Sequence, residues 1–158
     1  MKKLLFIVGV SMLLANTSNA QENAVKVNPI GLVFGIANAG YEFEVNDSQT
    51  VTVSGIYYGL TGISGFGIGG EYRFYLTDDS FRGWHAGPAV GYLGLSEKIT
   101  DSSSGFFSIG GEGGHQWIVG ENIVLDAFIG ISVLTGSGNF STLNTVSPTL
   151  GFSVGYAW

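Results

Sequence analysis

The last twelve residues, 147–158, alternate strictly between large or apolar side chains and small or polar ones. A period of two indicates a β-strand with one apolar face. The segment also ends on aromatic residues, and outer-membrane barrels carry girdles of aromatic side chains at both interfaces. We therefore expect it to be the closing strand of a membrane-spanning β-barrel. The large or apolar positions are Pro148, Leu150, Phe152, Val154, Tyr156 and Trp158.

The composition supports strands over helices as the place for the apolar residues. The chain is 45% hydrophobic and 11% charged, yet after the first twenty residues no run reaches the about 18 apolar residues of a membrane helix. Only helices and closed barrels span bilayers. The absence of cysteine excludes a disulfide scaffold and thiolate metal sites. A net charge of −6 makes nucleic acid an unsuitable partner.

The N-terminus has the three parts of a secretory signal peptide. Lys2 and Lys3 precede an apolar stretch over residues 4–14, and Ser18 and Ala20 are the small residues of a cleavage site. We expect residues 1–20 to be removed on export. Residues 21–158 then form one outer-membrane barrel domain.

Alternating segments separated by turn residues predict an all-β, eight-stranded, antiparallel, up-and-down transmembrane barrel. The phase of the first strand is ambiguous, because Val25 and Val27 are out of phase with Ile30, and Pro29 between them cannot donate to a ladder. A bulge there or a late start to pairing is expected. The predicted strands are residues 25–36, 39–45, 50–60, 65–76, 83–95, 106–118, 123–134 and 147–158.

The connections and the aromatic residues are arranged as in such a barrel. Short polar turns follow the second, fourth and sixth strands, and the longest loops are residues 96–104 and 135–146. The outward aromatic residues fall near the strand ends, where they form two expected girdles. Phe74, Trp84, Trp117, Tyr156 and Trp158 belong to the periplasmic girdle, and Tyr57, Phe66, Tyr92 and Phe107 to the outer one.

Polar residues occupy the face opposite the apolar one, and we expect them to point into the lumen. A buried charge network that cross-links the wall is the first interpretation, because buried charges must be paired. A proton or cation path is the alternative, although eight strands leave an interior filled by side chains. The expected network is Glu42, Glu44, Glu71, Arg73, His85, Glu112, Gln116 and Asp126.

No motif indicates catalysis, a cofactor or a metal. Residues 65–70 fit G-x-G-x-x-G, but a strand follows them, whereas a dinucleotide site needs a helix. His85 and His115 suggest a lipid-modifying hydrolase or acyltransferase only if a serine lies beside them at the outer leaflet. Both are expected near the periplasmic end, so we predict no enzyme activity.

Five segments resemble a domain-of-unknown-function family of short Gram-negative outer-membrane barrels, similar in architecture to the OmpA and OmpX barrels. They are KVNPIGL at residues 26–32, GYEF at 40–43, GEYRFYL at 70–76, GPAVGY at 87–92 and GGEGGHQW at 110–117. The resemblance extends over nearly the whole mature chain. Its motifs are structural, so it implies a fold and a location and no catalytic residue.

These observations predict a monomeric outer-membrane protein with a structural or surface-interaction role and no catalysis. A narrow cation or proton channel through the acidic lumen is the second hypothesis, and a lipid A-modifying barrel enzyme is the third. The expected partners are outer-membrane lipid and, through residues 147–158, the barrel-assembly machinery.

Overall fold

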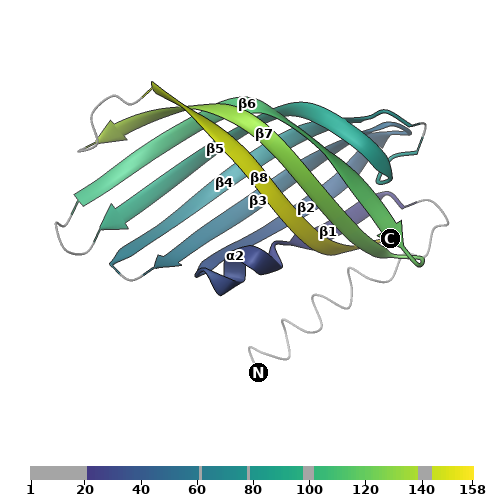
Figure 1. The fold of residues 1–158 in the computed structure, drawn as a ribbon, viewed down its shortest axis with the longest axis horizontal. Helices are drawn as coiled ribbons and strands as arrows, with labels where there is room; N and C mark the ends of the chain where they lie inside the picture. Colours follow the sequence, from purple (N-terminus) through teal and green to yellow (C-terminus); the bar gives the residue numbers. More distant parts are fainter. Residues whose placement is uncertain (1–20, 61, 78, 98–101, 139–143) are drawn as a thin grey trace.

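The computed structural model describes residues 21–60, 62–77, 79–97, 102–138 and 144–158. The expected signal peptide, residues 1–20, lies outside this part of the chain. Each strand pairs antiparallel with its neighbour in sequence, and the last closes on the first (Figure 1). This confirms the predicted all-β, eight-stranded antiparallel barrel. The elements are β1 (Asn23–Val27), α2 (Pro29–Val33), β2 (Ile36–Asn46), β3 (Gln49–Leu60), β4 (Ile63–Tyr75), β5 (Gly83–Glu97), β6 (Ser102–Val119), β7 (Ile123–Gly138) and β8 (Asn144–Ala157).

The predicted first strand, residues 25–36, is wrong after Val27, because a short helix interrupts it. The Asn28 side chain accepts a hydrogen bond from the Gly31 N–H at 2.9 Å, and Pro29 occupies the first turn. Both are helix-start signals, and they outweigh the local alternation of apolar residues. Gly35, with φ of 75°, follows the helix and turns the chain into β2.

β1 is therefore too short to pair with β8 along its length. Four positions pair, from Ala24 with Ala157 to Val27 with Val154. Residues 144–153 of β8 are paired with β7 on one side, and no strand of the described residues pairs with them on the other. Helix α2 lies at this place and contacts both β2 and β8, and Figure 1 shows it between the end of β1 and the start of β2.

Several strands are longer than predicted at the end of the barrel opposite Asn23 and Trp158. β5 continues to Glu97 and β6 begins at Ser102, so the predicted loop 96–104 is largely strand. β7 likewise continues to Gly138, and β8 begins at Asn144. The serine and threonine residues of these segments continue the hydrogen-bonded ladders, because the residues next to them in the strands are already in register. Among the described residues, no helix is long and apolar enough to cross a membrane.

The aromatic residues expected in girdles stand on the outer surface, with one exception. Tyr57 pairs with Phe66 at one end of the wall. The exception is Trp158, which is only 7% exposed, because its ring lies 6.3 Å from those of Tyr41 and Tyr156. The exposed members are Tyr57, Phe66, Phe74, Trp84, Tyr92, Phe107, Trp117 and Tyr156.

Candidate functional site: an ionic cluster beneath a cavity

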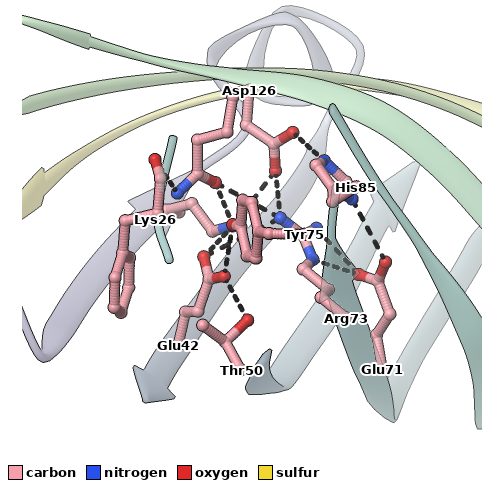
Figure 2. A network of polar contacts seen from close by, with 10 residues as sticks. Lys26, Glu42, Thr50, Glu71, Arg73, Tyr75, His85 and Asp126 are labelled. Carbon is pink, nitrogen blue, oxygen red and sulfur yellow. Dashed lines mark hydrogen bonds and ion pairs between the residues drawn. The ribbon is translucent and has the colours of Figure 1, made fainter. Parts of the chain in front are cut away.

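Charged and polar side chains from seven strands, β1 to β7, meet inside the barrel in one buried group, the ionic cluster (Figure 2). Six of the eight residues predicted for the lumen network belong to it. Three more were not predicted, namely Lys26, Thr50 and Tyr75. The predicted members are Glu42, Glu71, Arg73, His85, Gln116 and Asp126.

Lys26 on β1 connects β2, early in the sequence, with β6 and β7, late in the sequence. It is 4% exposed, and its Nζ donates to Glu42 Oε2 at 2.6 Å, Asp126 Oδ2 at 3.0 Å and Gln116 Oε1 at 3.1 Å. These contacts use all three donors of an ammonium group. A Cβ on Gly155 of β8 would lie 2.8 Å from Lys26 Cγ, so the glycine leaves room for the lysine stem. The prediction missed Lys26 because the phase of the first strand could not be determined before Pro29.

Arg73 on β4 joins opposite sides of the wall. Its Nε and Nη2 contact Glu71 Oε2 at 2.8 and 2.7 Å, and its Nη1 contacts Asp126 Oδ2 on β7 at 2.7 Å. Charge-assisted hydrogen bonds of this length are about twice as strong as neutral ones. The guanidinium therefore cross-links two strands that are not neighbours in the sheet.

The carboxylates of the cluster accept further hydrogen bonds. Glu42 Oε1 accepts from the Thr50 hydroxyl at 2.6 Å and from the Tyr75 hydroxyl at 2.8 Å. His85 Nε2 lies 3.1 Å from Asp126 Oδ1. Such saturation is what keeps charged groups inside a protein, because an unpaired buried charge is costly.

Two buried polar atoms of the cluster have no hydrogen-bond partner among the described residues. His85 Nδ1 and Glu71 Oε1 are buried, lie 4.0 Å apart, and make no hydrogen bond within the described residues. The other charged and polar groups of the cluster are connected by the hydrogen bonds and ion pairs described above. The cluster is therefore suited to cross-linking the wall.

Two of the predicted network residues lie outside the cluster. Glu44 is half-buried on β2 and makes no side-chain contact with the cluster in the described part of the chain. Glu112 is half-buried on β6 and lines the cavity described below. Its carboxyl group makes no hydrogen bond or ion pair with any described residue.

The barrel interior is filled on the side of the cluster nearest Asn23 and Ala157. Ala24, Val124, Ala157 and Phe81 are fully buried there and pack together. Phe81 has a positive φ of 66°, which is rare for an aromatic residue, and its carbonyl accepts from Gln116 Nε2 at 3.0 Å. The turn before β5 thus folds inward and joins the cluster to a small apolar plug.

A cavity of about 590 Å³ lies on the other side of the cluster. The prediction of a side-chain-filled interior therefore holds for one end of the barrel only. Lys26, Glu71, Arg73, Glu112 and Asp126 form its polar end. Its size and mixed lining are those of small-molecule sites. The inward apolar side chains around the rest of it are Ile56, Tyr58, Leu93, Leu95, Phe106, Phe128 and Leu134.

The two histidines lie on different faces of the wall. His85 is inside the cluster, whereas His115 lies outside between Trp84 and Trp117, with ring centroids 4.9 and 4.3 Å away. They cannot act on one substrate from these positions. No group of three or more metal-ligating side chains is assembled among the described residues.

Comparison with known proteins identifies a family. The family model described as "Protein of unknown function (DUF3575)" matches residues 5–137, which is most of the chain. No curated protein matches. The expected assignment to a family of unknown function is confirmed by this match.

Proposed function

Because the chain belongs to the DUF3575 family of proteins of unknown function, we propose its function from the barrel itself. It is a small, monomeric, integral protein of a Gram-negative outer membrane. It reaches that membrane through a cleaved signal peptide over residues 1–20. Its role is structural or in surface interaction, without catalysis.

One observation carries the proposal, namely that the wall is apolar outside and charged inside. A large apolar side chain on every strand is between 39% and 82% exposed, while the charges of the cluster are buried. A soluble protein rarely exposes a continuous apolar surface of this extent. A bilayer is the solvent that matches it. The exposed residues, one for each strand, are Val27, Tyr41, Val53, Ile68, Val90, Ile109, Ile129 and Leu150.

The closed end of the interior supports a role other than conduction. An ion that crossed the barrel would have to separate the contacts of Arg73 with Glu71 and Asp126 and then pass the plug around Phe81. Separating buried ion pairs costs several kcal/mol, about 3–5 for the loss of one partner. We therefore rank the narrow cation or proton channel second, and lipid A modification third because the histidines are apart.

The outer-membrane proposal also names the partners. The apolar surface contacts membrane lipid, and β8, the closing strand, is the segment that the barrel-assembly machinery would engage. Trp158 N–H and carbonyl both bond to Asn23 of the first strand at 2.9 and 3.1 Å, so closure of the barrel depends on these last residues.

Heat-modifiability of the outer-membrane fraction tests the proposal. The full chain is expressed in a Gram-negative host, and its gel mobility in detergent is compared with and without boiling. We expect a band in the outer-membrane fraction that shifts on boiling, because a closed barrel resists detergent until it is heated. A chain lacking residues 1–20 is the control and should not reach that fraction. An unshifted band in the soluble periplasmic fraction would overturn the proposal.

A further inference from the structure

Over residues 144–153, the edge of β8 next to α2 has no strand partner among the described residues. Trp158 exchanges main-chain hydrogen bonds with Asn23, and Ala157 N–H bonds to the opposite side at Asn122. Alternate residues of a strand direct their N–H and C=O to the same neighbour. The main chain of Phe152 and Leu150 therefore faces the place that β1 would occupy if it continued past Val27.

Pro148 is suited to this unpaired edge. It lies in the same alternate series, so an N–H at this position would have no strand to bond with. Proline has no N–H, and within sheets it is confined to edges and bulges. No described residue of α2 or β2 makes a main-chain hydrogen bond to residues 145–152. The wall thus has a gap in its strand pairing, bounded by β8 on one side and by α2, which covers it, and the start of β2 on the other.

The gap is apolar on its outer side. Ile30, Leu32 and Val33 of α2 are all exposed, and the helix buries none of its residues. On the facing strand, Val146 and Leu150 are exposed. A five-residue helix that buries none of its residues, beside a strand edge without main-chain hydrogen bonds, is the wall element best able to yield to a hydrocarbon chain.

The interior cavity reaches both margins of this gap. Its lining includes Asn28 and Asn38 on the side of α2, and Ser147 and Thr149 on the side of β8. Beyond them the lining is largely apolar, and Phe106 and Phe128 belong to it. An apolar chain that entered through the gap would leave lipid for a lining of similar polarity.

The polar end of the cavity determines the head group. Lys26 and Arg73 already contact the carboxylates of the cluster. Glu112 lines the same space and has no partner among the described residues. Across this end, two cationic side chains face three carboxyl groups, those of Glu71, Glu112 and Asp126. This balance disfavours an anionic head group and favours a hydrogen-bond-donating cation.

We propose that the cavity binds a single-chain amphiphile with an ammonium head group, which enters from the membrane through the gap between α2 and β8 and places its head group at Glu112. The inference rests on the proposed membrane location. It goes beyond that location by assigning a ligand class to the interior.

Photo-crosslinking from the bilayer tests the site. Protein purified from the outer membrane is reconstituted in phosphatidylcholine vesicles with a long-chain alkylamine that carries a diazirine in its chain. We expect label on inward residues such as Phe106 and Phe128, identified by peptide mass spectrometry. A fatty acid of the same length should label them about tenfold less, the factor for loss of one charge-assisted hydrogen bond. Label confined to outward residues such as Val53 and Tyr92 would overturn the proposal.

Matched variants separate the cavity and the head group from general effects. Ser54→Trp fills the cavity and should abolish inward label, whereas Val53→Trp, one residue away on the outer face, should not. Ser132→Trp is the second filling variant if Ser54→Trp fails to fold. Glu112→Gln should lower amine label to the fatty-acid level, and Glu44→Gln should leave it unchanged. Equal label from amine and acid on the wild type would refute the head-group assignment.

Lateral entry is measured separately. The chain has no cysteine, so a nitroxide can be attached at Thr149→Cys beside the gap or at Ser54→Cys behind paired strands. Dissolved oxygen concentrates in the bilayer and shortens the spin-relaxation time of a nitroxide that it reaches. We expect this effect of oxygen to be several-fold larger for the label at Thr149→Cys than for the label at Ser54→Cys. Equal shielding at both positions would refute entry through the gap. Heat-modifiability of each sample distinguishes a failed inference from a barrel that is not in the membrane.

Discussion

Replacement of Arg73 by alanine removes the guanidinium that cross-links β4 and β7. Arg73 is 3% exposed and contacts Glu71 and Asp126 at 2.7–2.8 Å, so its loss leaves two buried carboxylates with one cation fewer. Breaking a buried ion pair by deleting one partner costs about 3–5 kcal/mol. For a chain of this size, each kcal/mol corresponds to about 2–4 °C. We expect the folded barrel to be lost about 10 °C lower than in the wild type.

The assay follows the unboiled, fast-migrating band of the purified protein in detergent as incubation temperature rises. Arg82→Ala is the matched control, because Arg82 is exposed in the turn before β5 and its side chain makes no contact with the cluster in the described residues. The control should melt with the wild type. An Arg73→Ala transition at the wild-type temperature would refute the idea that the cluster stabilises the wall.

Three further outcomes follow from the same geometry. Lys26→Met should lower the urea midpoint by an amount corresponding to about 3–5 kcal/mol, since Glu42 and Asp126 lose their shared ammonium; an unchanged midpoint by tryptophan fluorescence would contradict the role of Lys26. In planar bilayers, the wild type should show no unitary conductance, because the cluster and the plug around Phe81 fill one end of the interior; reproducible single-channel steps that vanish in Glu112→Gln would instead support the cation path. Mass spectrometry of lipid A should give the same species with and without expression of the protein, because His85 and His115 lie on different faces of the wall; a new lipid A species would restore the enzyme hypothesis.

The sequence by itself determined the eight-strand pattern and the two faces of the wall, although not every strand end, because both depend on local periodicity. A residue two positions along a strand points the same way whatever its neighbours are. This is why Glu71 and Arg73 could be placed together inside, and why Asp126, within an otherwise apolar segment, could be placed on the inward face too. Six of the eight predicted network residues meet in the cluster for this reason.

The tertiary structure decided what depends on pairing across long sequence separations. Lys26 reaches Asp126, 100 residues away, only because β1 closes on β8. Trp158 is covered because the first strand and Tyr41 pack against it. The helix-start signal at Asn28 and Pro29 is present in the sequence. Its consequence for the pairing of β8 depends on the closed barrel. A five-residue β1 leaves residues 144–153 of β8 without a described strand on one side, and only the closed barrel shows that gap beside the interior cavity.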